Sequence, residues 1–280
     1  LTLCVGRAAV PGPIVLSARD LPGLAALWLF FLWLRVLDEH KDFEADAVAH
    51  PDRVLQRGLV TLGELRVVGG VSLAIQLAVS LWIDGGCGAV AAWWLAAVAW
   101  SLLMAKEFFV REWLRQHIMW YAFSHMVVML LLVAWVAAMG APGAVQSRAP
   151  WLLAALVYMS GLAFEMGRKM RAPQDEHPLA DSYTQALGVS TATRALEVVV
   201  AFAAALALIT VAAFRTGIPR WASVVAIGSV VLAVVVLGEF RRRPEKRTAK
   251  RVEAGVGVSI LAIHIVVLTT VIQTRSIAWR

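Results

Sequence analysis

Residues 21–50, LPGLAALWLFFLWLRVLDEHKDFEADAVAH, pass from an apolar run into a cluster of acids. The apolar part, residues 21–37, is close to the roughly 20 residues that a helix needs to cross a bilayer. Neither Gly nor Pro interrupts residues 24–50, so one helix can leave the membrane and continue until Pro51 stops it. The stretch therefore predicts a transmembrane helix with a charged extension.

The acidic extension places several carboxylates on one side of this helix. At about 100° per residue, four of them share a sector of the predicted helix: Asp38, Glu39, Asp42 and Asp46. Lys41 and Glu44 are expected to point elsewhere. Like charges at this spacing repel one another unless a cation lies among them, and Mg²⁺ bridged by phosphate oxygens is such a cation. A solvated acidic helix end is the alternative.

The composition favours a membrane protein of the all-α class. Of the 280 residues, 60% are hydrophobic and 16% are charged, which is too apolar for a soluble domain. We expect a bundle of about nine transmembrane helices that forms a single domain over residues 1–280, its first helix being a span that lacks its beginning. The predicted spans are residues 1–16, 21–37, 65–83, 87–105, 119–139, 150–165, 195–214, 219–238 and 255–273.

The positive charges of the chain predict its orientation in the membrane. With nine spans, the side that carries the acidic helix would hold 20 of the 26 Lys and Arg residues, Arg7 among them. Cytoplasmic loops are enriched in these residues. We therefore expect a multi-pass protein of a bacterial-type cell membrane, with the acidic helix facing the cytoplasm. The net charge of +7 then reflects contact with the lipid bilayer, and no nucleic-acid partner is expected.

Two arginines follow the acidic helix. Thr61 and Glu64 are spaced as a capping box that opens the next helix, so Arg53 and Arg57 lie between two helix ends. The planar guanidinium group suits a diphosphate. Ordinary interfacial arginine is an equal alternative.

A second acidic segment follows the span at residues 150–165. It mixes carboxylates and cations, which is compatible with a site for metal ions and phosphates and also with a plain solvated loop. Its charged candidates are Glu165, Arg168, Lys169, Asp175, Glu176 and Asp181.

Two polar residues lie in or beside the apolar span 119–139. His125 is typical of a helix–helix hydrogen bond inside a membrane, although an inward-facing site residue is the alternative. Tyr121 is assigned, with several tryptophans, to the aromatic belt at the membrane surface. The alternative for these rings is an internal pocket in which their π faces stabilise a cation.

These motifs resemble the UbiA superfamily of intramembrane prenyltransferases. The family's first motif, Asn-Asp-x-x-Asp-x-x-x-Asp, stands here as Asp38-Glu39-x-x-Asp42-x-x-x-Asp46. The segment from Arg53 to Gly58 is similar to the family's Arg-Pro-Leu-Pro-x-Gly. The second motif, usually aspartates at four-residue spacing, departs from the pattern and reads Glu165-x-x-Arg168-Lys169. A Tyr-x-x-x-Lys element of some members keeps Lys106 but has Leu102 in the place of Tyr.

The resemblance implies Mg²⁺-dependent transfer of a prenyl group from an isoprenoid diphosphate to an aromatic or lipid-like acceptor. By this resemblance the catalytic residues are Asp38, Asp42 and Asp46. The implied metal ligands are Asp38, Glu39, Asp42, Asp46, Glu165, Asp175, Glu176 and Asp181. The implied diphosphate ligands are Arg53, Arg57, Lys106, Arg168 and Lys169.

Two other functions remain open. A UbiA-type terpene cyclase would use the same donor site without a second substrate, and the altered second motif leaves room for it. A non-catalytic transport or lipid-handling protein is the third possibility. It ranks last because the charged residues collect at one side rather than near the membrane midplane.

Overall fold

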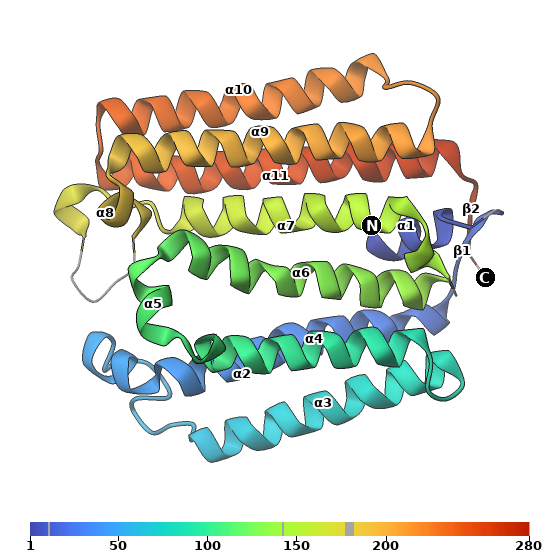
Figure 1. The fold of residues 1–280 in the computed structure, drawn as a ribbon, viewed down its shortest axis with the longest axis horizontal. Helices are drawn as coiled ribbons and strands as arrows, with labels where there is room; N and C mark the ends of the chain where they lie inside the picture. Colours follow the sequence, from blue (N-terminus) through green and yellow to red (C-terminus); the bar gives the residue numbers. More distant parts are fainter. Residues whose placement is uncertain (11, 142, 177–181, 280) are drawn as a thin grey trace.

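Eight long helices form the body of the protein in the computed structural model, which describes residues 1–10, 12–141, 143–176 and 182–279 (Figure 1). The long helices are α2 (Leu21–Ala49), α3 (Leu62–Asp84), α4 (Ala89–Ala105), α6 (Ile118–Gly140), α7 (Arg148–Arg168), α9 (Val189–Phe214), α10 (Arg220–Arg242) and α11 (Lys246–Thr274). The shorter elements are α1 (Thr2–Ala8), α5 (Arg111–Gln116) and α8 (Tyr183–Leu187), the 3₁₀ turns Ala18–Asp20, Glu107–Phe109, Ala144–Gln146 and Pro173–Asp175, and the strands β1 (Ile14–Leu16) and β2 (Ile277–Trp279). The all-α class is confirmed.

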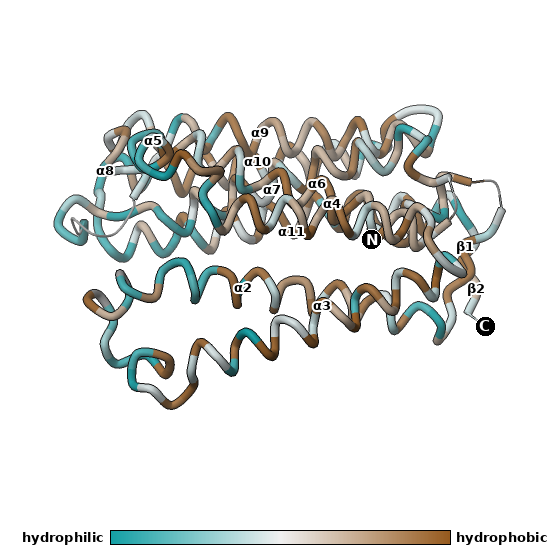
Figure 2. The backbone as a smooth tube through the Cα atoms, turned by 60° about the horizontal axis from the view of Figure 1, so that its bottom comes forward, coloured by the Kyte–Doolittle hydropathy of each residue, from teal (hydrophilic) through white to brown (hydrophobic). Residues whose placement is uncertain are grey.

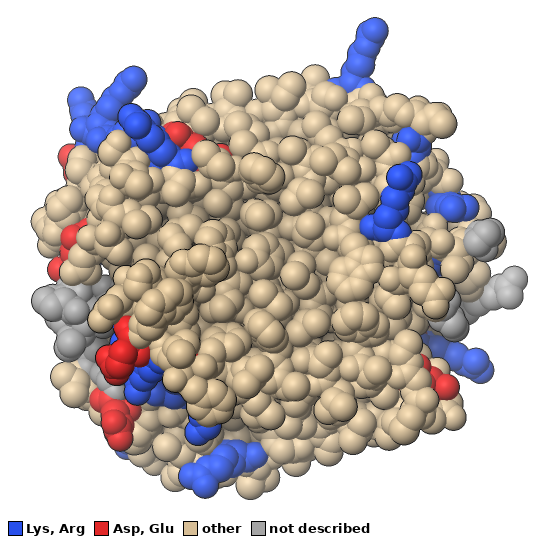
Figure 3. All heavy atoms as spheres, viewed as in Figure 1, with Lys and Arg blue, Asp and Glu red and all other residues tan. Residues whose placement is uncertain are grey.

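Seven of the described helices are long and apolar enough to cross a membrane, and α4 is a shorter apolar helix. Their large hydrophobic side chains are exposed on the outside of the bundle, with Trp28 at 68% and Val224 at 68% exposure. Figure 2 shows hydrophobic residues along the middle of the helices and hydrophilic residues toward one end. On the face in Figure 3, Lys, Arg, Asp and Glu lie toward the two ends and leave an uncharged middle. An apolar girdle of this kind is the surface of a membrane protein.

The expected first span is the one element that differs. In the described part of this stretch, residues 1–10 and 12–16, the only helix is the seven-residue α1, and β1 pairs in parallel with β2 at the other end of the chain. Gly12 has a φ of +121° and Pro13 has no N–H to donate, so the apolar residues cannot continue as one helix. The prediction of a span at residues 1–16 was therefore wrong.

Because residues 1–16 do not cross the membrane, Arg7 lies at a different end of the bundle from the one predicted. Arg7 donates two hydrogen bonds to Asp20, at 2.9 and 2.5 Å, at the beginning of α2 and thus at the end opposite the acidic extension. It also donates to the carbonyl oxygen of Gly140 at 3.2 Å. Arg7 therefore lies on the side of the membrane opposite to the one predicted. The eight long helices still alternate in direction as predicted.

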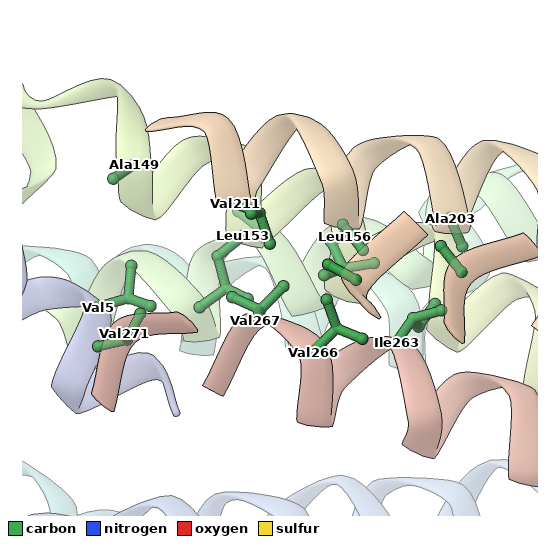
Figure 4. Packing of buried hydrophobic residues seen from close by; sticks show 14 of the residues in the cluster. Val5, Ala149, Leu153, Leu156, Ala203, Val211, Ile263, Val266, Val267 and Val271 are labelled. Carbon is green, nitrogen blue, oxygen red and sulfur yellow. The ribbon is translucent and has the colours of Figure 1, made fainter. Parts of the chain in front are cut away.

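The core between α7, α9 and α11 combines leucines with small and β-branched aliphatic residues. Leu153 and Leu156 of α7 pack with Ile263 and Val267 of α11, and all four side chains are at most 1% exposed (Figure 4). Ala203 of α9 lies in the same cluster. Small side chains such as Ala203 let helices approach closely. Close packing of this kind stabilises helix association in a membrane, because the lipid tails are as apolar as the side chains and the hydrophobic effect between helices is lost.

Hydrogen bonds buried in the bundle fix the position of α2. The indole N–H of Trp33 donates to Ser101 Oγ of α4 at 2.9 Å. From α3, Ser72 Oγ donates to the carbonyl oxygen of Leu29 at 2.8 Å and accepts from the side-chain amide of Gln76 at 3.0 Å. Since a polar group in hydrocarbon must find a partner within the protein, these bonds set the register of α2 against its neighbours.

Candidate functional site

A cavity of about 560 Å³ extends from the charged end of the bundle inward between α2, α4, α6 and α7. Its inner part is apolar and includes Phe31, Leu34, Val128 and Met129. Its outer part is polar and charged. The polar and charged lining residues are Arg35, Asp38, Glu39, Lys41, Asp42, Asp46, Arg53, Ser101, Tyr121, His125, Glu165, Arg168 and Lys169.

The carboxylates predicted to share a face of α2 all line this cavity. The helix continues to Ala49 with His50 as its C-cap, as the absence of Gly and Pro predicted. Three of these acids have basic neighbours: Glu39 pairs with Arg35, Asp46 with Arg53 at 2.5 Å, and Asp38 approaches Lys41 at 3.9 Å. Asp42 forms no salt bridge within the described part of the chain.

Lys41 also lies in the cavity, and the prediction that it points elsewhere was wrong. Its side chain is 10% exposed and its Nζ donates to the hydroxyl of Tyr121 on α6 at 2.9 Å. The same Nζ lies 5.5 Å from the centre of the Tyr121 ring. The direction of a Cα–Cβ bond on the helix does not decide where a flexible four-carbon side chain ends.

The end of α7 brings the second charged segment to the same cavity. Glu165 receives a cation at each of its two carboxylate oxygens: Lys169 at 2.9 Å and Arg168 at 2.7 Å. The Nζ of Lys169 lies 5.6 Å from the ring centre of Tyr121, so α2 and α7 both place a lysine beside one phenol. Acidic and basic segments that are more than 100 residues apart thus meet at one site.

The remaining predicted residues lie elsewhere. Arg57, Lys106, Asp175 and Glu176 are not among the residues that line the cavity. Lys106 follows the end of α4 and is exposed, and three successive residues with positive φ come directly after it, at 107–109. Asp181 lies outside the described residues.

Tyr121 and His125 line the cavity, whereas the sequence favoured an interfacial belt for Tyr121 and a helix–helix hydrogen bond for His125 and gave a pocket or site role only as the alternative. The rings of these two residues are stacked with their centres 3.8 Å apart. The Nδ1 of His125 lies 2.8 Å from the carbonyl oxygen of Tyr121, and a carbonyl only accepts, so this nitrogen carries the proton. Their i, i+4 spacing on an apolar helix was the available signal, and it is equally typical of packing.

The comparisons with known proteins agree with this architecture. The pattern of the UbiA prenyltransferase family matches residues 1–261. The chain belongs to the UbiA prenyltransferase family. Prenyltransferases of this family are membrane proteins, and this member is a multi-pass integral membrane protein by its apolar helices.

Two solved structures share the fold of this UbiA-family chain. One is from work on digeranylgeranylglyceryl phosphate synthase in membranes, with 14% sequence identity, a TM-score of 0.66, and coverage of 97% of this chain and 91% of that one. The other is the apo structure of a UbiA homolog from Aeropyrum pernix K1, with 19% identity, a TM-score of 0.64, and coverage of 95% of this chain and 97% of that one. No curated protein sequence matches this chain.

The two charged segments differ in how well they suit the divalent ion that the family implies. In the described parts of the chain, no three acidic, His or Cys side chains cluster closely enough to hold a metal ion by themselves. Mg²⁺ often binds to only one or two carboxylates plus the phosphates of a substrate, and the free carboxylate of Asp42 next to Asp38 fits that mode. Glu165 does not fit, because both of its oxygens already face cations.

Proposed function

We propose that this protein is a Mg²⁺-dependent prenyltransferase that moves a prenyl group from an isoprenoid diphosphate to an aromatic or lipid-like acceptor within the membrane. The single observation that carries the proposal is the cavity, which is charged where the bundle ends and apolar where it enters the membrane. An isoprenoid diphosphate has the same two halves, an anionic head and an oily tail.

The charged half of the cavity would bind the diphosphate head. Arg53, Arg168 and Lys169 present cationic donors there, and cation–phosphate hydrogen bonds are about twice as strong as neutral ones. The apolar half, between α2, α4 and α6, would hold the first isoprene units and exclude water. The rest of the tail would extend into the surrounding lipid, along the exposed hydrophobic surface of the bundle.

The carboxylates of α2 face this head group and would hold the divalent ion. Asp38 and Asp42 are the principal ligands in this proposal, with Glu39 and Asp46 beside them. The bound Mg²⁺ would stabilise the negative charge that develops on the diphosphate as it leaves. Because Arg35 and Arg53 neutralise Glu39 and Asp46, the acidic face can hold an anionic ligand without strong repulsion.

The reaction balances without a further reactant. The C1–O bond of the allylic donor breaks and the electron pair leaves with the diphosphate. A nucleophilic carbon or oxygen of the acceptor forms the new bond to C1 and loses a proton. The apolar wall protects the allylic carbocation from water until the acceptor reaches it.

Product analysis tests the proposal. Purified protein in detergent is incubated with geranyl, farnesyl or geranylgeranyl diphosphate, with and without Mg²⁺, in the presence or absence of a lipid extract and simple phenols. We expect an alkylated acceptor that depends on Mg²⁺. A cyclic hydrocarbon or terpene alcohol from the donor alone would replace the transferase with a cyclase, and no consumption of any donor would refute both.

We further propose that the cavity faces the cytoplasm, because Lys and Arg are concentrated at its end of the bundle. Cys87 is exposed in the turn between α3 and α4, at the other end. In intact cells, a membrane-impermeant maleimide should therefore label Cys87 from outside. Labelling only after the cells are opened would reverse the orientation.

A further inference from the structure

We infer that Lys41 and Lys169, together with the hydroxyl of Tyr121, form a metal-independent binding site for the diphosphate, in the place where a second acidic motif would hold metal. This inference rests on the proposed function for the identity of the ligand. It assigns Glu165 a positioning role rather than a role as metal ligand.

The two lysines have hydrogen-bond donors to spare. An ammonium group carries three donors. The Nζ of Lys41 uses one on Tyr121 at 2.9 Å, and among the described residues its closest carboxylate oxygen, on Asp38, is 3.9 Å away. The Nζ of Lys169 uses one on Glu165 at 2.9 Å. Both side chains line the cavity, so the remaining donors are available to a ligand there.

The charges at this point of the cavity favour an anion over a second cation. Glu165 faces Arg168 and Lys169 together, so this group has an excess of positive charge. Lys41 adds another cation beside the same Tyr121 ring, with the two Nζ atoms 5.5 and 5.6 Å from the ring centre. Asp38, 3.9 Å from Lys41 Nζ, and Asp42 are the carboxylates that face this lysine from its own helix, and they are the ones assigned to Mg²⁺. Cations gathered at the edge of an apolar cavity repel one another unless an anion lies among them. Phosphate oxygens supply that anion.

Tyr121 holds this arrangement in position. Its ring is stacked on His125 on the same helix, which fixes the direction of the hydroxyl toward Lys41. The π face of the ring also favours cations near it. The phenol is therefore a neutral anchor: a lysine from α2 and a lysine from α7 both lie within 5.6 Å of its ring centre, and its neutral hydroxyl leaves both positive charges in place.

Binding of inorganic pyrophosphate in the presence of EDTA tests the inference directly. Titration calorimetry on the full chain in detergent should show binding to the wild type without metal. Lys41→Gln and Lys169→Gln should each weaken it about tenfold to a hundredfold, the range expected for a hydrogen bond to a charged group. Lys250→Gln removes an exposed lysine of α11 and serves as the matched control, with affinity unchanged within twofold. Lys169→Arg should restore most of the binding.

The outcomes separate this inference from the proposed function. Binding of pyrophosphate only with Mg²⁺, or equal affinity in the wild type and both Gln variants, would overturn the lysine site even if the enzyme transfers prenyl groups. Metal-free binding that depends on the lysines would support it even if no donor is turned over. Should Lys169→Gln fail to fold, Lys41→Gln decides by the same criterion. Glycerol phosphate represents a lipid headgroup, and affinity equal to that of pyrophosphate would show that the site is not built for a diphosphate.

Glu165→Gln provides an independent measurement. If Glu165 only positions Arg168 and Lys169, the Mg²⁺ concentration for half-maximal donor turnover stays unchanged, while the affinity for pyrophosphate in EDTA falls. A large increase in the Mg²⁺ requirement would make Glu165 a metal ligand and would contradict the inference.

Discussion

The hydrogen bond between Trp33 and Ser101 is predicted to hold the acidic helix against α4. The Nε1–Oγ distance is 2.9 Å, Ser101 is fully buried, and Trp33 is 9% exposed. Gly69 of α3 makes room for the indole, since a Cβ there would lie 3.1 Å from the Trp33 ring. Because Ser101 also lines the cavity, the bond couples the position of α2 to the site.

The size of the effect follows from the surroundings of the bond. Side-chain hydrogen bonds between membrane helices contribute about 0.6 kcal/mol on average and up to about 1.7 kcal/mol. Ser101→Ala leaves the buried indole N–H without its partner, so we expect a loss of about 1–2 kcal/mol in the free energy of unfolding. Trp33→Phe removes the donor together with part of the buried ring. The coupling energy in the double-mutant cycle should therefore be about 0.6–1.7 kcal/mol.

Reversible unfolding in mixed detergent micelles measures all four proteins of this cycle. The double variant should be more stable than the sum of the two single losses predicts. Once Trp33→Phe has removed the indole N–H, Ser101→Ala no longer breaks a hydrogen bond and costs less. Strict additivity within about 0.3 kcal/mol would show that the bond contributes nothing. The reasoning that α2 is fixed by its buried polar contacts would then be refuted.

Three further variants probe other contacts. Asp20→Asn leaves the part-buried guanidinium of Arg7 without its carboxylate and should cost about 1–2 kcal/mol in the same unfolding assay; an unchanged stability would show that the ion pair is dispensable. Gly140→Val should destabilise the contact between α1 and α6, because a Cβ at this position would lie 2.9 Å from the carbonyl oxygen of Leu3; wild-type thermal stability would contradict the close approach. Arg53→Gln should raise the KM for the donor several-fold with a smaller change in kcat, as steady-state kinetics would show, and an unchanged KM would remove Arg53 from the diphosphate site.

Helix boundaries were predictable where the local chemistry of the chain decides them. The absence of Gly and Pro from residues 24–50 predicted the extension of α2. Thr61 and Glu64 form the predicted capping box: Glu64 N donates to Thr61 Oγ1 at 3.2 Å, and Thr61 N donates to Glu64 Oε2 at 2.8 Å. Apolar composition alone was insufficient at residues 1–16, since hydropathy does not report that the backbone turns at Gly12.

The site was only partly predictable because helical phase locates backbones rather than the ends of long side chains. It grouped Asp38, Asp42 and their neighbours correctly on the cavity side of α2. It misplaced Lys41, whose ammonium reaches Tyr121 across a helix interface. Contacts between α2, α6 and α7 depend on the packing of segments far apart in the chain, and no single local pattern encodes them.

Release of diphosphate from an allylic donor by the wild type and by Asp42→Asn tests the central claim most directly. Asp42 has no salt bridge among the described residues, so the substitution leaves the fold intact and removes one charged oxygen ligand. With geranylgeranyl, farnesyl or geranyl diphosphate and Mg²⁺, we expect the release rate to fall at least about a hundredfold, equivalent to roughly 3 kcal/mol, and the Mg²⁺ requirement to rise. Equal release by both proteins, with the same Mg²⁺ dependence, would contradict the claim that the acidic face of α2 holds a divalent ion against the donor.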